Sequence, residues 1–242
     1  MLKIGDKKLI GAWAFYDWAN SVYSLVISTA VFPLFYSAIT EGKTVIFLGM
    51  KWDHADTLYS YALSFSFLVV AFMSPILSAI ADYTGNKLKF MKFFCWLGGL
   101  SVMSMYFFED LNTAWIGIVC TILASIGFWS SIVFYNSYLP EVAHPEQQDA
   151  ASAKGFIYGY IGSIILLLGC LAMILAPDTF GFDLSISDAV LANGSEAEIN
   201  NALENAKNAA SLKAMRISFV MVGLWWIGFA QITFKKLPNN SF

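Results

Sequence analysis

The chain has 242 residues, of which 58% are hydrophobic and only 13% are charged. A soluble domain carries about 25% charged residues because its surface must be hydrated, so this composition excludes a soluble enzyme and a disordered scaffold. The net charge of −3, with no basic run, excludes a nucleic-acid-binding protein. Most of the surface must therefore face lipid, and the lipid bilayer is the first expected partner.

Charged residues separate six apolar runs along the chain. A helix needs about 20 apolar residues to cross the hydrocarbon of a bilayer. We therefore predict an all-α membrane protein, a bundle of six transmembrane helices that forms one domain over residues 1–242. The expected spans are about 9–39, 57–81, 90–109, 111–139, 153–177 and 214–234. Residues 178–213 are expected to be an extracytoplasmic loop with an amphipathic helix, for which Ser195 is the predicted N-cap.

Six spans place both termini on one side of the membrane. Lysines are more frequent on the segments that are cytoplasmic if the N-terminus is inside, as the positive-inside rule predicts; they are Lys3, Lys7, Lys8, Lys87, Lys89, Lys92, Lys154, Lys235 and Lys236. We expect an integral protein of a bacterial cytoplasmic membrane with cytoplasmic N- and C-termini. The first run is too long for one upright helix, so we also expect it to tilt or to bend near Pro33.

Asp17 is the one charged residue deep inside an apolar run. A charge in hydrocarbon is costly, so an intramembrane carboxylate faces protein or water and is a functional candidate. Asn20, Ser24 and Ser28 follow it at helical intervals as a polar stripe, which Tyr23 overlaps. Three interpretations of Asp17 remain open: a structural contact between helices, a contact with substrate or a coupling ion, or a side chain that reaches the membrane surface.

The fourth span ends in a second polar group, Tyr135 and Asn136, before Pro140 and Glu141. A buried asparagine must find partners, because an unpaired buried polar group costs about 1–3 kcal/mol. Glu141 is expected to be a solvated acid at the membrane boundary. Together with the first span, this group defines the candidate contacts for substrate or a coupling ion, which are Asp17, Asn20, Tyr23, Tyr135 and Asn136.

Small residues recur at four-residue intervals on the fifth span, at Ala151, Gly155, Gly159 and Ser163. Small side chains let helix backbones approach closely in lipid. We predict that Gly155, Gly159 and Ser163 pack against a neighbouring helix. The pattern by itself does not separate a transporter from an inert bundle.

The short loop between the second and third spans contains Asp82, Gly85 and Lys87. A carboxylate here can accept hydrogen bonds at the N-terminus of a facing helix, where the macrodipole favours negative charge. The glycine permits a turn with positive φ. Because such a contact can form in one conformation and break in another, we predict that these three residues form a gating loop.

This loop resembles the signature between helices two and three of the major facilitator superfamily, a G-x-x-x-D-x-x-G-[RK] type of pattern. Ser78 stands at the first glycine position, Asp82 and Gly85 match, and Tyr83 replaces a common basic residue. Three further segments resemble the autophagy-related vacuolar amino-acid effluxer branch of that superfamily: AFYDWANSVYSLVISTAVFP (14–33), FYNSYLPEVA (134–143) and SAKGFIYGYIGS (152–163).

The resemblance implies the N-terminal six-helix half of a major facilitator fold, since a family member has twelve helices in two halves. It implies a secondary transporter that moves a small polar solute by alternating access, and the eukaryotic relatives suggest amino acids. The implied partners are a small-molecule solute and either the missing C-terminal six-helix half or a second copy of the chain. The alternative is a half-size, non-transporting membrane interaction or assembly module.

Neither an enzyme nor a cofactor is expected. Asp17 has no titratable partner in the interior of another span, whereas intramembrane catalysis needs an acid or base within reach. His54 and His144 stand alone in loops and cannot bind a haem in the bundle or build a zinc site, so we predict no metal. The sequence contains no G-x-x-x-x-G-K-[ST] phosphate loop, which argues against primary transport.

Overall fold

The computed structural model describes residues 3–84, 86–187, 190–191 and 194–238. Within these residues, six helical segments are long and apolar enough to cross a membrane: Lys7–Thr40, Ala55–Ile80, Lys87–Phe107, Leu111–Val142, Pro145–Leu175 and Glu196–Phe234. The apolar runs fold as helices because hydrocarbon offers no water to the backbone, so each N–H and C=O group pairs within its own segment. The predicted class, an all-α membrane protein with six spans, is confirmed.

The first span changes its helix type twice. Helix α1 (Lys7–Val22) passes into a π-helical segment (Tyr23–Val31) and then into α2 (Phe32–Thr40). Pro33, which has no N–H to donate, lies in the first turn of α2, where proline is tolerated. The irregularity of this span is therefore a π-helix directly before Pro33, a feature that is frequent at functional sites.

Among the other spans, the second, fifth and sixth are each part of one long helix, whereas the third and fourth also include short helical segments at their ends. A small antiparallel hairpin lies between α2 and α3, with Ile46 of one strand paired with Lys51 of the other. In chain order the remaining elements are β1 (Val45–Phe47), β2 (Met50–Trp52), α3 (Ala55–Thr84), α4 (Lys87–Ser104), a 3-10 turn (Met105–Phe107), a second 3-10 turn (Leu111–Thr113), α5 (Ala114–Ser137), α6 (Leu139–Val142), α7 (Pro145–Leu175), a third 3-10 turn (Pro177–Phe180) and α9 (Glu196–Phe234).

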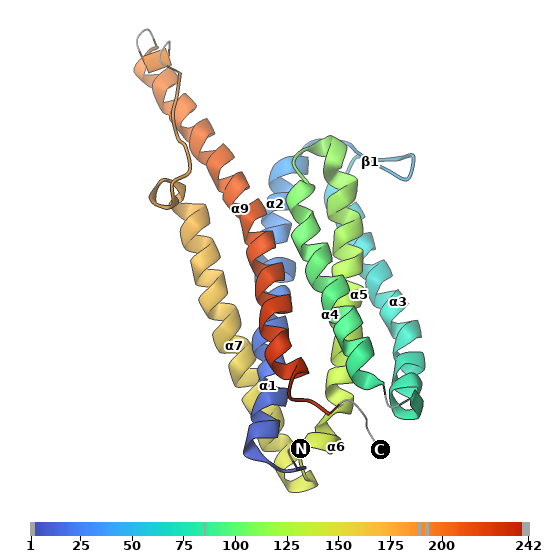
Figure 1. Ribbon diagram of the computed structural model, residues 1–242. Coiled ribbons are helices and arrows are strands. Elements are labelled where there is room, and N and C mark those ends of the chain that lie inside the picture. The colour runs from blue at the N-terminus through green and yellow to red at the C-terminus, as the bar shows by residue number, and fades with distance from the viewer. Residues whose placement is uncertain (1–2, 85, 188–189, 192–193, 239–242) are drawn as a thin grey trace.

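The sixth span differs from the expectation of a separate amphipathic helix followed by a span near residue 214. Both belong to the single helix α9. Ser195 is its N-cap as predicted: the Ser195 hydroxyl accepts from the N–H of Glu198, and the Glu198 carboxylate accepts from the N–H of Ser195. Residues 196–222 contain no glycine or proline to interrupt the helix. Its first part therefore extends beyond the ends of the neighbouring spans (Figure 1).

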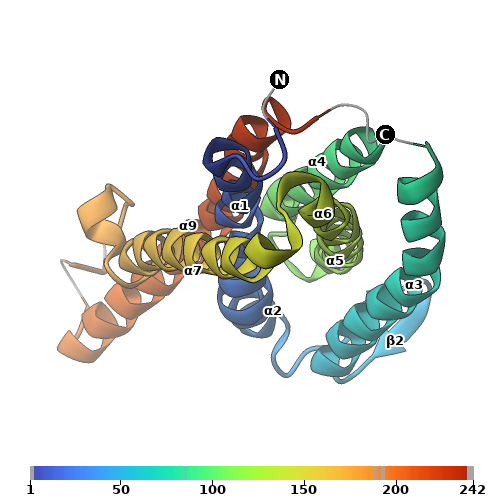
Figure 2. The same cartoon turned by 90° about the horizontal axis from the view of Figure 1, so that it is seen from below.

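The two ends of the bundle carry different segments. Both termini lie at one end, together with α6, the end of α3 and the start of α4, whereas the β1–β2 hairpin and the start of α9 lie at the opposite end (Figure 1). Seen along the bundle, α1 and α5 are central, and α3 and α7 lie on opposite sides of α5 (Figure 2). The first span thus contacts α5, α7 and α9.

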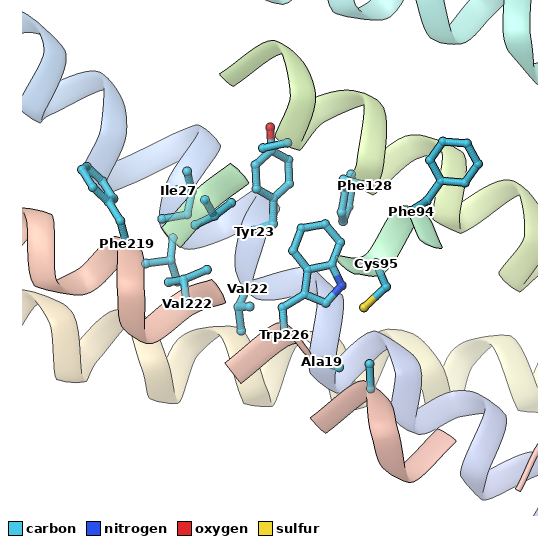
Figure 3. Packing of buried hydrophobic residues seen from close by; sticks show 14 of the residues in the cluster. Ala19, Val22, Tyr23, Ile27, Phe94, Cys95, Phe128, Phe219, Val222 and Trp226 are labelled. Atoms are coloured by element: carbon cyan, nitrogen blue, oxygen red, sulfur yellow. The ribbon is translucent and has the colours of Figure 1, made fainter. Parts of the chain in front are cut away.

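Aromatic packing fixes the first span against α5 and α9. The indole of Trp226, which is fully buried, lies 5.7 Å from the ring of Tyr23 and 6.0 Å from that of Phe128, measured between centroids (Figure 3). Gly98 of α4 makes room for this indole, because a Cβ atom there would overlap Trp226. The core on this side determines which face of the first span is left for other contacts.

Candidate functional site

A cavity of about 560 Å³ lies between the first span, α5 and α7. Four of the five residues proposed from the sequence line it: Asp17, Asn20, Tyr135 and Asn136. The other lining residues are Trp13, Ser21, Ser24, Leu25, Thr29, Phe128, Trp129, Ile132, Ser152, Phe156, Gly159, Tyr160 and Ser163. Asp17 and Asn20 of the first span and Tyr135 and Asn136 of the fourth therefore share one hollow between membrane-spanning helices.

The carboxylate of Asp17 is held by Tyr135. The Tyr135 hydroxyl donates to Asp17 Oδ2 over 2.9 Å. The Tyr135 ring stacks on Trp13 with centroids 4.3 Å apart and planes 9° from parallel, and Trp13 Nε1 donates to the Tyr135 carbonyl over 2.9 Å. Because Tyr135 is fixed by both its ring and its backbone, the carboxylate that it binds has a defined position.

Gly155 and Gly159 allow α7 to approach this pair. A Cβ atom at Gly155 would overlap Asp17 Oδ2 and would lie 2.9 Å from the Tyr135 hydroxyl. At Gly159 it would lie 2.5 Å from Ser21 Oγ. The glycines that the small-residue pattern assigns to packing thus also leave space for the polar atoms of the site.

Two buried polar atoms at the cavity have no hydrogen-bond partner among the described residues. They are the amide nitrogen of Asn20 and the hydroxyl of Ser163, and each side chain is 1% exposed. An unpaired buried donor costs about 1–3 kcal/mol. Both residues line the cavity, and the hydrogen-bonding capacity of these two atoms is unused.

Tyr23 lies outside the cavity, contrary to the expectation. Its ring packs in the core, 5.0 Å from Phe128 and 5.7 Å from Trp226 between centroids (Figure 3). At 3.6 residues per turn, position 23 is about 120° around the helix from Asp17, whereas position 21 is only about 40° away. The helical spacing therefore places Ser21, which was not among the predicted residues, on the face of Asp17 and places Tyr23 away from it.

The structure describes only part of the predicted gating loop of Asp82, Gly85 and Lys87. Gly85 and the side chain of Asp82 lie outside the described residues. Lys87 is 6% exposed at the start of α4, and its ammonium group binds Glu141 Oε1 at 2.5 Å and the carbonyl of Ser137 at 3.2 Å. Glu141 is therefore an ion-pair partner that ties α6 to α4, and the expectation that it is a freely solvated acid is wrong.

Fold and site together define an integral membrane protein with a polar cavity between three of its spans. A family model described as "Vacuole effluxer Atg22 like" matches residues 5–241. The chain belongs to this family, a branch of the major facilitator superfamily, and the resemblance found in the sequence is confirmed.

Three curated relatives show how much of such proteins the chain covers. It is 37% identical to the "Uncharacterized MFS-type transporter YxiO" of Bacillus subtilis (strain 168), over 74% of this chain and 40% of the relative. It is 20% identical to "Autophagy-related protein 22" of Coccidioides immitis (strain RS), over 93% of this chain and 47% of the relative. It is 25% identical to an uncharacterized protein of Aquifex aeolicus (strain VF5), over 70% of this chain and 40% of the relative. The chain therefore spans less than half the length of these relatives. No solved structure gives a significant match.

Proposed function

We propose that this chain is one six-helix half of a secondary transporter, the N-terminal half, which moves a small polar solute by alternating access. The observation that carries the proposal is the cavity in which Asp17, held by Tyr135, shares a hollow with Asn20 and Asn136. A carboxylate and amides at membrane depth have no role against lipid and are typical of a solute or ion pathway. Amino acids are the first solutes to test, because the resemblance to the vacuolar amino-acid effluxer branch implies them and the matching family model is described as a vacuole effluxer.

Four cavity residues have a proposed role. Asp17 contacts the solute or carries a coupling proton, since a carboxylate can accept a proton or pair with a cation. The amide nitrogen of Asn20 and the side chain of Asn136 donate to polar groups of the solute. Tyr135 positions the Asp17 carboxylate and is itself a wall of the cavity.

Alternating access needs a second structural unit, because such transporters hold substrate between two halves that rock around it. We propose a second six-helix bundle as the partner, either a C-terminal half or a second copy of this chain. We propose that the gating loop of Asp82, Gly85 and Lys87 opens and closes one end of the pathway as the halves move, with the Lys87–Glu141 pair as one of its contacts.

The proposed orientation places the termini in the cytoplasm of a bacterial cell. Its support is the lysine distribution, together with the position of both termini at the end of the bundle where α3 meets α4 (Figure 1). Cytoplasmic accessibility of an epitope fused after Phe242 tests this orientation directly.

Solute uptake into proteoliposomes tests the function. The chain is reconstituted, an equimolar mixture of ¹⁴C-labelled amino acids is added under an inward proton gradient, and uptake is followed together with internal pH. Binding is measured in parallel from tryptophan fluorescence in detergent, since Trp13 and Trp129 line the cavity.

Saturable uptake or binding that is lost in Asp17→Asn supports the proposal. The matched control is Asp149→Asn, an exposed carboxylate of α7 that is not among the cavity residues. Wild-type protein with neither uptake nor binding for any solute class, both as the chain alone and as the chain reconstituted together with a C-terminal six-helix half, would overturn the proposal and favour the assembly module. Unchanged pH dependence in Asp17→Asn, with uptake retained, would remove Asp17 from proton coupling.

A further inference from the structure

The β1–β2 hairpin projects sideways from the bundle at the end opposite the termini, beyond the top of α3 (Figure 1). Its base is well held: Val45 is fully buried, and the Thr44 hydroxyl donates to Asp53 Oδ1 over 2.8 Å. The Trp52 ring packs edge-on against Tyr61 of α3, with centroids 5.8 Å apart. The hairpin therefore has a fixed position with respect to the membrane spans.

The turn of the hairpin contains an unfavourable residue. Leu48 has a φ of 52° and Gly49 a φ of 76°, so both central residues are in the left-handed region. Two-residue turns of this type favour Asn-Gly, because a side chain with a Cβ atom is strained there and asparagine tolerates the strain best. Leu48 is nevertheless 80% exposed. Neither turn geometry nor core packing accounts for a leucine at this position.

Three apolar side chains are exposed together on this hairpin. Ile46 is 63% exposed and Met50 is 54% exposed, next to Leu48; these three residues are called the hairpin tip. Lys51 lies directly opposite Ile46 in the ladder and is exposed. Exposed apolar residues beside a lysine, with a tryptophan at the base, are the combination found where proteins meet the boundary between headgroups and acyl chains.

We propose that the hairpin tip inserts into the headgroup–acyl boundary of the bilayer, with the Lys51 ammonium group paired with lipid phosphate. The hairpin connects the ends of two membrane spans, at Thr40 and Ala55, so it is held at the level of the membrane surface. Trp52 at the base of the hairpin also contacts Tyr61, which belongs to a set of exposed apolar residues on α3 with Phe65, Leu68 and Phe72. The partner of this surface is therefore phospholipid, and this holds whether or not the cavity transports a solute.

A fluorescent probe measures the depth of the hairpin tip. Leu48→Cys is labelled with the environment-sensitive fluorophore NBD and reconstituted in phosphatidylcholine vesicles that contain a minority of phosphatidylglycerol. The native cysteines Cys95, Cys120 and Cys170 are buried and react poorly. Glu204→Cys, on the exposed part of α9, is the aqueous control.

Insertion predicts that nitroxide at carbon 5 of the acyl chain quenches the label at position 48, and that aqueous iodide quenches it roughly threefold less than the label at position 204. Equal iodide quenching at the two positions would overturn the proposal. Protection from both iodide and lipid nitroxide would also overturn it, because the tip would then be covered by protein, either a second bundle or a second copy.

A second variant separates insertion from folding. Leu48→Asn suits the left-handed turn, so its melting temperature in detergent should equal or exceed that of the wild type. A label at Ile46→Cys should nevertheless lose about half of its lipid-nitroxide quenching when Leu48→Asn is added. Unchanged quenching in the doubly substituted protein would show that Leu48 does not anchor the hairpin.

Discussion

The Tyr135 hydroxyl donates to the Asp17 carboxylate over 2.9 Å, and thereby joins the fourth span to the first inside the apolar bundle. The interaction has two consequences. It stabilises a group that is costly in hydrocarbon, and it leaves the second carboxylate oxygen for another partner in the cavity. The pair is thus both a contact between helices and the centre of the proposed solute site.

Tyr135→Phe should reduce the affinity for solute more than it reduces the stability of the fold. The ring would remain stacked on Trp13, so the loss of one hydrogen bond should lower the free energy of unfolding by only about 1 kcal/mol. The apparent affinity for the amino-acid mixture should fall about tenfold, because the carboxylate is no longer held in place. Fluorescence titration and thermal melting measure the two effects. Tyr158→Phe, a tyrosine of α7 outside the cavity, should change neither affinity nor melting.

Gly155→Ala should destabilise the protein by about 1–3 kcal/mol, as expected for overpacking at a close helix contact. The added methyl group would overlap Asp17 Oδ2 and press on the Tyr135 hydroxyl. Gly169→Ala on the same helix is the matched control, because open space surrounds its Cβ position. Alanine favours a helix over glycine by about 1 kcal/mol, so Gly169→Ala should not be destabilising. Equal melting temperatures for the two variants would contradict the close approach of α7 to α1.

Removal of either member of the Lys87–Glu141 pair should destabilise the bundle by about 1–3 kcal/mol, because the remaining charge would lose its partner at a largely buried position. Lys87→Met and Glu141→Gln are the single variants. The double variant should lose clearly less stability than the two single variants lose in sum, since neither charge is then left without its partner. Thermal melting of all four proteins gives the coupling energy. Strict additivity would show that the two side chains do not interact.

Low pH should reduce the stability that Asp110 contributes as a helix cap. Asp110 lies in the turn between the third and fourth spans. Hydrogen bonds from the side chain and the backbone of Thr113 hold the pKa of Asp110 below its ordinary value. A lowered pKa contributes stability above the unfolded-state value of about 3.9, and this contribution is lost as the pH falls through the folded-state pKa. Thr113→Val should therefore lower the melting temperature at pH 7 and lower it less near pH 3. A deficit that does not change with pH would contradict this account.

The sequence predicted part of the candidate site. Asp17 and Asn136 could be recognised because polar groups in hydrocarbon are rare and costly, and both line the cavity. Tyr23 could have been excluded by its angle around the helix, since it lies about 120° from Asp17. Glu141 could not be identified as the partner of Lys87, because 54 residues separate them and nothing local marks the contact.

The sequence alone determined that most of the protein surface faces lipid, and it determined the six spans, the cap at Ser195 and the family. Each of these depends on composition or on residues that are close along the chain. The transfer of an apolar run into lipid is a property of that run and needs no neighbouring helix. Only the tertiary structure decided that Tyr135 meets Asp17, that Gly155 leaves space for both, and that Tyr23 turns toward Trp226. These contacts depend on how each helix is rotated about its axis, and that rotation is set by the packing of all six spans together.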